Sequence, residues 1–394
     1  MSPLCNTLVE PERHNHAEVF YPLHAFVCEQ CFLVQLEQYV GPEEIFGDYS
    51  YFSSYSDSWV EHARRYTDSM VERFGLDASS LVMEIASNDG YLLQHFVKIG
   101  VPVLGIEPAA NVAKFAVEKG VPTRVDFFGV RLATELRAQG VMADLIAGNN
   151  VLAQVPDLND FIAGIKIILK TKGVVTIEFP HLVKTIEGNQ FDQIYHEHFS
   201  YFSLLSAETA FARHDLTLFD VDELPTHGGS IRIYMCHAEN DSLPVTAKVK
   251  AIRDHELAKG YDKVEFYDTF RAQTEEAKRK LLAFLIDAKN CGKKIVGYGA
   301  PGKGNTLLNY CGIRTDFLDF VVDRNVHKHG KFTPGTHIPV LPPSAVDEAK
   351  PDYLLILPWN LKTEIMKQMK HVGSWGCKYV VPVPELTVID PGSI

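Results

Sequence analysis

From Ser80 onward, short apolar segments alternate with longer amphipathic segments, and this alternation limits the fold more than any other feature of the chain. Helical periodicity is clear in the intervening stretches, for example YLLQHFVKIG and AANVAKFAVEKG. Buried strands that alternate with helices indicate a doubly wound α/β sheet. The strands predicted from this pattern cover residues 81–85, 101–108, 122–128, 143–152 and 173–180.

A second alternating pattern begins at KKIVGYGAPGKGNTLLNYCG and continues through DFVVDRN, YLLILP and YVVPVP. A mostly helical stretch separates the two patterns. With 394 residues, the chain also exceeds what one ordinary hydrophobic core accommodates. We therefore predict four parts: a small N-terminal domain (1–58), a first α/β domain (59–235), a helical connector (236–285) and a second α/β domain (286–394).

Composition argues against several classes of protein. The formal net charge is −12, whereas binding to nucleic acid or to anionic membranes needs a basic surface. The first residues, MSPLCNTLVEPERHNH, lack the apolar core of a signal peptide, and no run of about 18 apolar residues predicts a membrane span. The seven cysteines are few and odd in number, which favours a reducing compartment, so we expect a cytoplasmic protein.

The segment ASNDGYLLQHF follows the first predicted strand and is typical of a tight turn that leads into a helix. Asn88 or Gly90 can take the left-handed conformation that such a turn needs, and the N–H groups of the turn can approach a ligand closely. About 20 residues later, Glu107 follows the second strand, where an acidic group can accept hydrogen bonds from ribose hydroxyls. One glycine alone is a weak dinucleotide fingerprint, so the prediction depends on the ordered set.

Three more polar or aromatic residues extend this set. Asp126 could accept a hydrogen bond from an adenine amine, and Phe127 could stack on the base. Asn149 lies near the end of the fourth strand, where ligands of open α/β sheets bind. The alternative for each residue is an ordinary polar group at a turn or strand end.

A second glycine cluster, Gly297, Gly299, Gly302 and Gly304, also follows a strand and opens a helix. Its spacing leaves two interpretations, a structural turn and a phosphate or diphosphate site. It is not a P-loop, because no Ser or Thr follows the lysine at the required place. Surface ion pairing is the usual fate of charged residues, but the candidates for contacts with a diphosphate or sugar are Arg232, Lys303, Asp323, Arg324 and Lys331.

The stretch FDQIYHEHFSYFS concentrates titratable and aromatic side chains. As a strand it would place His196 and His198 on one face and Glu197 on the other. Three interpretations compete: a metal site, an acid–base centre, and a half-buried strand whose polar groups are satisfied. Further along, His227 in THGGS could line the same cleft or cap a turn.

The sequence CEQC places Cys28 and Cys31 at the spacing of half a structural zinc site. A complete site needs four ligands, and the upstream cysteine and histidines have irregular spacing. Two reduced thiols in a small N-terminal layer are the alternative.

Seven motifs then occur in order: MEIASNDGYLL, GIEPAANVA, FDQIYHEHFSYFS, HGGSIRIY, VGYGAPGKGNTLLNYCGI, VDRNVHKHGKFTPGTHIPV and LILPWN. Together they resemble the S-adenosylmethionine-dependent C-methyltransferases of nucleotide-deoxysugar biosynthesis, from about Pro3 to Pro384. These enzymes methylate a ring carbon of a nucleotide-linked 4-keto-6-deoxysugar. The resemblance implies a small zinc-binding N-terminal domain, a central class I methyltransferase domain that holds S-adenosylmethionine, and a C-terminal Rossmann-like domain that contributes to nucleotide-sugar binding.

The resemblance also implies roles for individual residues. His198 would remove the proton beside the ketone, because an imidazole with a pKa of about 6.5 suits that step. Tyr195 and Glu197 would polarise the ketone and orient the imidazole. Tyr49 would close the pocket, and Glu84 would belong to the cofactor site. Strand parity places Glu197 and His198 on opposite faces, so a direct contact between them requires a loop or a bulge.

Two departures from the family pattern stand out. Gln154 occupies the place of a histidine that the family usually has near the methyl donor, and a glutamine cannot accept a proton. CEQC resembles the second of two CxxC pairs, and the first pair would precede the beginning of this chain, so zinc would lack ligands. We expect a methyltransferase that acts on a small nucleotide-sugar substrate. The alternatives are an O- or N-methyltransferase on a related sugar nucleotide or glycan precursor, an NAD-dependent oxidoreductase that uses the second glycine cluster with Asp323, and a non-catalytic nucleotide-sugar binder.

Overall fold

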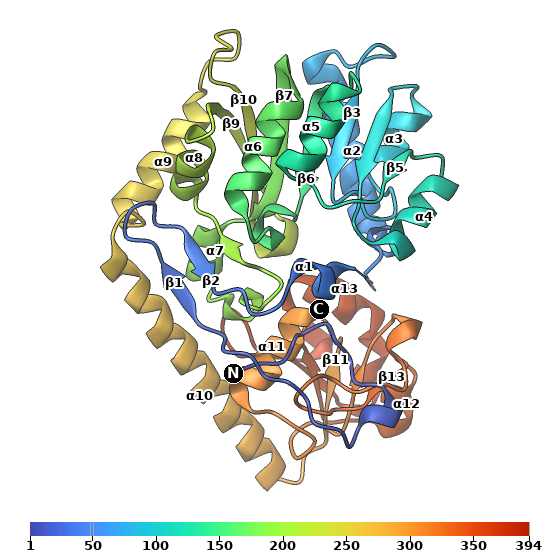
Figure 1. The fold of residues 1–394 in the computed structure, drawn as a ribbon. Helices are drawn as coiled ribbons and strands as arrows, with labels where there is room; N and C mark the ends of the chain where they lie inside the picture. The colour runs from blue at the N-terminus through green and yellow to red at the C-terminus, as the bar shows by residue number, and fades with distance from the viewer. Residues whose placement is uncertain (48, 50, 394) are drawn as a thin grey trace. The chain divides into compact units, whose positions relative to one another are not determined.

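The computed structural model describes residues 1–47, 49 and 51–393, and the chain divides into two compact units (Figure 1). Unit 1 comprises Met1–Phe26, Leu182–Glu197 and Lys263–Ile394, and unit 2 comprises Val27–His181 and His198–Asp262. The predicted four-part division differs from this grouping. The first 58 residues are shared between the two units, and so is the stretch predicted as a helical connector.

Unit 2 contains a seven-stranded sheet with the order β5-β4-β3-β6-β7-β10-β9. The strands from β5 to β7 are parallel, whereas β10 runs antiparallel to both β7 and β9. The predicted doubly wound sheet is therefore confirmed. The strand bounds are β3 (Val82–Ile85), β4 (Val103–Ile106), β5 (Thr123–Arg124), β6 (Ala143–Asn149), β7 (Leu169–Pro180), β9 (Leu216–Leu224) and β10 (Ser230–His237).

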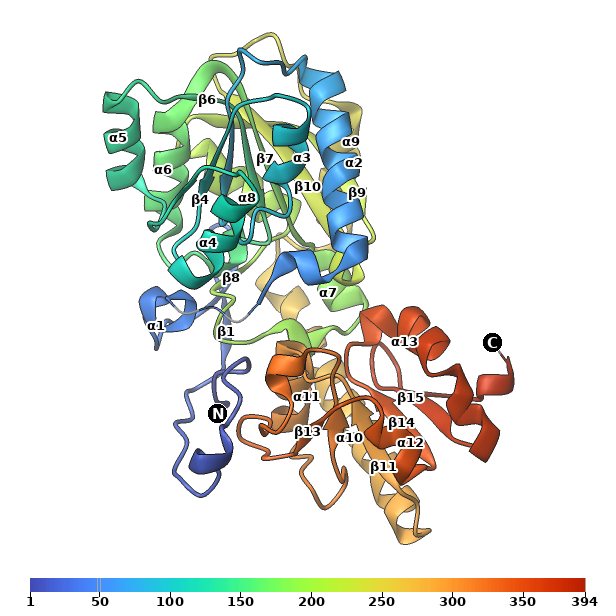
Figure 2. The same ribbon diagram turned by 90° about the vertical axis from the view of Figure 1, so that its right-hand side faces the viewer.

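Helices cover both faces of this sheet, and Figure 2 shows α5 and α6 on the opposite face from α2 and α3. Alternate residues of each strand point to opposite faces. Accordingly, Met83 and Ile146 join the core beneath α5, α6, α8 and α9, while Val82 and Leu145 join the core beneath α2, α3 and α4. The helix bounds are α2 (Asp57–Phe74), α3 (Leu93–Lys98), α4 (Ala110–Glu118), α5 (Val130–Ala138), α6 (Leu158–Ile168), α8 (Leu204–Ala212) and α9 (Ala247–Lys259).

A small three-stranded sheet has the order β1-β2-β8, with β1 (Ala25–Val27), β2 (Val34–Leu36) and β8 (Ser200–Tyr201). The short helix α1 (Pro42–Phe46) follows β2. The strand interpretation of the HEH segment is wrong. Tyr195, His196 and Glu197 form a bend and turn, and pairing begins only at Ser200, opposite Gln35.

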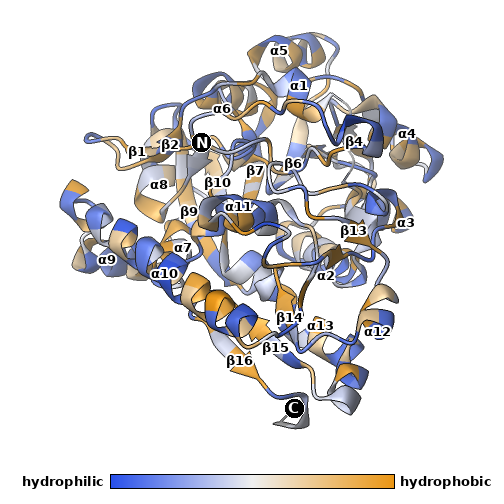
Figure 3. Ribbon diagram, turned by 90° about the horizontal axis from the view of Figure 1, so that it is seen from below, coloured by the Kyte–Doolittle hydropathy of each residue, from blue (hydrophilic) through white to orange (hydrophobic). Residues whose placement is uncertain are grey.

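Unit 1 contains a six-stranded sheet with the order β13-β12-β11-β14-β15-β16, parallel except for β16. Its longest helix, α10, buries Leu281, Leu285 and Ala288 at helical spacing, and Figure 3 shows the mixed polarity that results. The remaining bounds are α7 (Leu182–Glu187), α10 (Asp268–Asn290), β11 (Ile295–Tyr298), α11 (Gly302–Cys311), β12 (Val321–Val322), β13 (Val340–Leu341), α12 (Ala345–Ala349), β14 (Tyr353–Ile356), α13 (Lys362–Gln368), β15 (Lys378–Val381) and β16 (Thr387–Ile389).

The first 26 residues pack against this second sheet and its helices. Val9 forms a β-bridge with Phe332, and the carbonyl of Cys5 accepts a hydrogen bond from Asn305 Nδ2 at 2.7 Å. The carboxylate of Glu18 accepts hydrogen bonds from the Gly335 N–H. The N-terminal segment is thus part of unit 1. In the described part of the chain, no helix combines the length and apolar character that a membrane crossing requires.

Candidate functional site

The turn after β3 is built from residues with unusual backbone conformations. Ala86, Asn88 and Gly90 all have positive φ angles, of 59°, 49° and 77°. A Cβ atom at Gly90 would lie 3.1 Å from the Cβ of Ala116 on α4, so only glycine lets the turn pack this closely. The turn therefore brings its backbone against α4 at the carboxyl end of the sheet.

Glu107, directly after β4, fixes this turn. Its carboxylate accepts hydrogen bonds from the N–H groups of Asn88 and Ala109, each at 2.9 Å. Burial raises the pKa of Glu107, although these two hydrogen bonds lower it in part. The structure thus brings Asn88, Gly90 and Glu107 together, as the sequence pattern predicts.

Asn149 ends β6, which is the neighbour of β3. The strand order reverses between β3 and β6, and ligands of open α/β sheets bind at such a reversal. The side chain of Asn149 donates to the Tyr91 hydroxyl at 3.3 Å. Asn150, the next residue, has a positive φ of 56°, and its N–H donates to the Glu178 carbonyl at 2.7 Å. The turn after β3 and the end of β6 therefore lie side by side at this edge of the sheet.

The other predicted cofactor residues occupy different environments on the same sheet. Glu84 lies on β3 and is fully buried, and burial raises its pKa well above the usual range. Asp126 forms ion pairs with Arg131 and, at 3.6 Å, with Arg124, and the adjoining Phe127 is half-buried. Gln154 ends the 3-10 turn Leu152–Gln154 that follows β6.

Tyr49 lies beside α4, because Asn111 holds its backbone on both sides. Asn111 Nδ2 donates to the Tyr49 carbonyl at 2.9 Å, and Asn111 Oδ1 accepts from the Tyr49 N–H at 3.3 Å. Asn88 holds Tyr51 and Ser53 in the same way, through its amide nitrogen and oxygen. The aromatic segment is thereby attached to the turn that follows β3.

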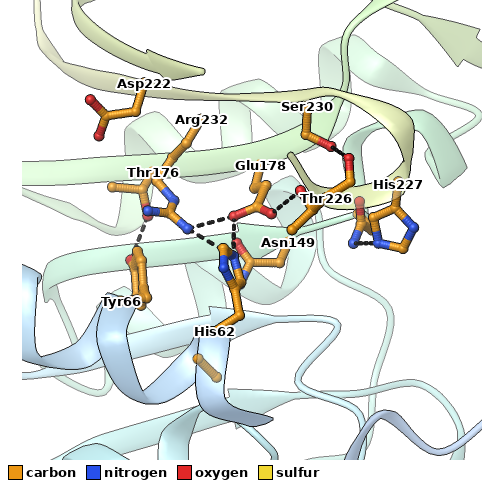
Figure 4. A network of polar contacts seen from close by, with 12 residues as sticks. His62, Tyr66, Asn149, Thr176, Glu178, Asp222, Thr226, His227, Ser230 and Arg232 are labelled. Atoms are coloured by element: carbon orange, nitrogen blue, oxygen red, sulfur yellow. Dashed lines mark hydrogen bonds and ion pairs between the residues drawn. The ribbon is translucent and has the colours of Figure 1, made fainter. Parts of the chain in front are cut away.

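A buried charged network lies behind this edge (Figure 4). Glu178 on β7 accepts hydrogen bonds from Arg232 at 2.5 Å and from His62 at 2.9 Å. Burial alone would raise the pKa of Glu178. The hydrogen bond from His62 and the positive charge of Arg232 outweigh burial, and the pKa falls to about 2. Arg232, a predicted contact for diphosphate, is only 5% exposed and forms an ion pair with Glu178.

Sequence reasoning missed Glu178, His62 and Trp59. Trp59 on α2 stacks on His62 and on Tyr91, with ring centroids 4.9 and 5.9 Å apart. The available signal was a charged residue inside the apolar strand GVVTIEFP, since a buried carboxylate needs a partner. That partner, His62, lies 116 residues away in the sequence.

The HEH segment is divided between the two units, and the boundary falls between Glu197 and His198. In unit 2, the N–H of Phe199 donates to the carbonyl of Ala153 at 2.6 Å. His198, which precedes Phe199, is therefore held next to the 3-10 turn that contains Gln154. Its half-buried ring packs edge-on against Tyr201, with ring centroids 6.1 Å apart.

In unit 1, Glu197 has its own set of partners. Asn6 Nδ2 donates to both carboxylate oxygens, at 2.8 and 2.9 Å. Burial raises the pKa of Glu197 to about 7, although the hydrogen bonds from Asn6 and Cys5 lower it in part. His196 is bound to the Pro22 carbonyl at 3.0 Å, and Tyr195 is half-buried in the same turn.

The second glycine cluster packs against the chain itself. A Cβ at Gly302 would lie 2.9 Å from Cys5 Sγ, and one at Gly299 would lie 2.6 Å from Pro358 Cδ. Asp323 accepts a hydrogen bond from the Ala300 N–H at 2.9 Å and pairs with Lys328. These glycines therefore permit internal packing.

The predicted substrate residues of unit 1 also have partners within the unit. Lys303 donates to Asn360 at 3.1 Å and lies over the ring of Trp359, while burial lowers its pKa. Lys331 pairs with Glu10 at 2.7 Å, and the exposed Arg324 pairs with Glu364 at 3.3 Å.

Cys28 and Cys31 lie in the turn between β1 and β2, with the thiols free and partly exposed. Across residues 1–47, 49 and 51–393, no group of three or more His, Cys, Asp and Glu side chains could hold a metal ion. Structural zinc sites need four ligands, so the described residues supply two thiols and do not by themselves form a zinc site.

Three protein-family models match the chain. "Putative zinc binding domain" covers residues 1–46, "Methyltransferase domain" covers 59–221, and "C-methyltransferase C-terminal domain" covers 225–384. Among curated proteins, C-methyltransferase NovU from Streptomyces niveus is 35% identical over 394 residues, which is 100% of this chain and 93% of NovU.

Solved structures overlap parts of the chain. An S-adenosylmethionine-dependent methyltransferase from Clostridium acetobutylicum is 10% identical, covering 45% of this chain and 92% of its own, with a TM-score of 0.36. Magnesium protoporphyrin IX methyltransferase from Synechocystis, solved with bound S-adenosylmethionine, is 15% identical, covering 50% of this chain and 88% of its own, with a TM-score of 0.35.

The sheet edge of unit 2 fits S-adenosylmethionine. The side-chain oxygens of Ser87, Asn149 and Asn150 are buried, and none has a hydrogen-bond partner in the described part of the chain. A bound ligand with amine and hydroxyl groups would satisfy such acceptors. The family models and the full-length similarity to NovU agree with this geometry. The chain belongs to the S-adenosylmethionine-dependent C-methyltransferases.

Proposed function

We propose that the enzyme methylates a ring carbon beside the ketone of a nucleotide-linked 4-keto-6-deoxysugar, through an enolate that a base generates. The observation that carries this proposal is the place of His198. The hydrogen bond from Phe199 to Ala153 holds it beside the turn that follows β6, at the cofactor edge of unit 2. The similarity to NovU, a C-methyltransferase, supports transfer to carbon.

The proposed chemistry begins with proton removal by His198. The imidazole accepts the proton from the carbon beside the ketone, and the electron pair of the broken C–H bond forms the enolate. Tyr195 donates a hydrogen bond to the enolate oxygen, and Glu197 orients the polar groups. Both of these roles depend on the resemblance to the family.

Other residues of unit 2 would bind the methyl donor and exclude water from it. Asn88, Gly90, Glu107 and Asn149 would hold the methyl donor, and Tyr49 would cover it. When bound, S-adenosylmethionine supplies an electrophilic methyl group on a sulfonium. Gln154, beside the His198 segment, can hold a hydrogen bond but cannot accept a proton, so we assign proton removal to His198 and not to Gln154.

The test combines labelled methyl donor with a panel of nucleotide 4-keto-6-deoxysugars in deuterated water. Mass analysis would then detect a product methylated on carbon and deuterium at the carbon beside the ketone. We expect His198→Asn to lower both turnover and deuterium exchange by about 10²-fold or more, the usual contribution of a general base. His196→Asn is the control, since His196 is bound to the Pro22 carbonyl, and it should retain both. Exchange that persists in His198→Asn would place the base elsewhere.

The same assay separates the alternatives. Methylation of oxygen or nitrogen would give a labelled product without deuterium beside the ketone. The oxidoreductase alternative has less support, because Asp323 and the glycines of the second cluster already contact the chain itself.

A further inference from the structure

We infer that His227 is an additional acceptor-binding residue, whose imidazole Asn150 orients at the cofactor edge of unit 2. The inference rests on the proposed function, because it takes the keto-sugar as the acceptor. Figure 4 shows His227 at the end of the polar network that contains Glu178 and Thr226.

The backbone at His227 is the first observation. His227 has φ of 53° and ψ of 19°, and it is followed by Gly228 and Gly229 with φ of 95° and 120°. A side chain with a Cβ atom is strained in this left-handed region, at a cost of order 1 kcal/mol or more. Glycine or asparagine would make the same turn with less strain. Histidine is among the non-glycine residues that adopt this region most often, so the contacts of its side chain decide its role.

The contact with Asn150 is the second observation. Asn150 also has a positive φ, of 56°, so the contact joins two left-handed residues from separate parts of the sheet edge. Asn150 Nδ2 lies 3.0 Å from His227 Nε2. The amide and the ring nitrogen form one hydrogen bond, whose direction follows the tautomer of the imidazole. Asn150 therefore orients the imidazole.

The loop that carries His227 is fixed on both sides. Thr226 Oγ1 donates to Glu178 Oε1 at 2.9 Å, which attaches the loop to the buried charged network. The carbonyl of Gly229 accepts from the His181 N–H at 3.0 Å. The imidazole also packs against Trp59 in a T-shaped arrangement, with ring centroids 5.4 Å apart. The imidazole is thus held in place before any ligand arrives, as binding groups require.

The surroundings of His227 are suited to the sugar part of the acceptor. Its side chain is partly exposed, so a ligand can reach it. An imidazole can bind hydroxyl and keto oxygens, whereas a diphosphate calls for cationic side chains. The ligand group that fits here is therefore a hydroxyl or keto oxygen of the sugar.

The test uses the full chain with His227→Asn and His227→Gly. Both replacements tolerate a positive φ, so we expect the free energy of unfolding to stay the same or to rise. Affinity for S-adenosylhomocysteine, measured by calorimetry, should change less than about twofold. The KM for the keto-sugar should rise roughly tenfold, the usual scale for losing one hydrogen bond to a buried or charged group.

A double-variant cycle then tests the role of Asn150. Asn150→Gly should raise the same KM, because the imidazole loses its orienting contact. Combining it with His227→Asn should add little to either single effect. An unchanged KM in variants of an active enzyme would overturn the inference, as would fully additive effects or a parallel loss of stability and S-adenosylhomocysteine affinity. If the wild-type protein methylates no keto-sugar of the panel, the proposed function itself fails.

Discussion

Glu197 shows at the scale of one residue how burial controls protonation. Glu197 is 4% exposed, and its carboxylate accepts two hydrogen bonds from Asn6 and one from Cys5. The pKa of about 7 in the folded state lies above the usual value of 4.5. Between these two pH values the folded protein retains a proton that the unfolded chain releases, so this group makes stability fall as pH rises.

We expect Glu197→Gln to remove that pH dependence. The wild-type protein should lose about 3 kcal/mol of unfolding free energy between pH 4.5 and pH 7 through this group, since one pKa unit corresponds to about 1.4 kcal/mol. Urea unfolding at pH 5 and pH 8 would measure the difference between the two proteins. Glu10→Gln, which alters an exposed pair with Lys331, is the control and should follow the wild type. Parallel pH profiles for wild type and Glu197→Gln would contradict the pKa.

Residues identified by spacing along the strands could be located from sequence. Asn88 follows β3, Glu107 follows β4 and Asn149 ends β6, and all three lie at one edge of the sheet. The partners of Glu178 could not be predicted, because His62 lies on an amphipathic helix whose residues resemble any solvated face. Pairing across 116 residues depends on the packed fold. A single sequence does not record it.

At the scale of elements, α8 shows how a buried carboxylate stabilises a helix terminus. Glu256 on α9 is fully buried and accepts hydrogen bonds from the N–H groups of Leu204 and Leu205, at 2.8 and 2.9 Å. It also contacts His181 at 2.7 Å. N–H groups in the first turn of a helix have no partner within the helix. A negative charge there also interacts favourably with the positive end of the helix dipole.

We expect Glu256→Ala to lower the free energy of unfolding by about 3 kcal/mol, since it leaves buried donors unpaired. Glu208→Ala provides a matched comparison on α8. Glu208 pairs with Arg253 at a partly exposed position, so its loss should cost less than about 1 kcal/mol. Urea denaturation of both variants would measure this contrast. Equal losses would show that the helix terminus does not depend on Glu256.

Strand prediction was accurate for some segments of the first α/β pattern and too generous for others. Residues 82–85 and 143–149 form strands within their predicted ranges, but the predicted strand at 122–128 shortens to Thr123–Arg124. The HEH segment has the alternating residues of a strand, yet it folds as a turn because Glu197 and His196 bind Asn6 and Pro22 in unit 1. Such tertiary contacts override local pattern.

At the scale of the whole molecule, two α/β sheets of similar design differ at the turn after their first strands. At the unit 2 edge, the buried side-chain oxygens of Asn149 and Asn150 have no hydrogen-bond partner in the described residues. In unit 1, Pro358 and Cys5 pack against the glycines of the corresponding turn. Sequence alone predicts two α/β patterns. It does not predict that each unit is built from separate stretches of the chain. A segment shows the same hydrophobic pattern whichever of the two sheets it packs against.

The difference between the two turns predicts that the protein binds S-adenosylmethionine and not NAD. S-adenosylmethionine at 100 times its Kd should stabilise the fold by about 2.7 kcal/mol and raise Tm accordingly. NAD at the same concentration should leave Tm unchanged. Thermal unfolding followed by fluorescence, with S-adenosylhomocysteine as a positive control, would measure both. A clear rise in Tm with NAD would revive the oxidoreductase alternative.

The hydrogen bonds between Asn6 and Glu197 have a practical consequence for handling the protein. The buried acid of the HEH segment has a hydrogen-bond partner near the start of the chain, 191 positions away. Trimming those first residues would remove the hydrogen-bond partner of a buried carboxylate in unit 1, far along the sequence from the cut. The opening segment is therefore best regarded as core, and kept intact in any preparation meant for kinetics.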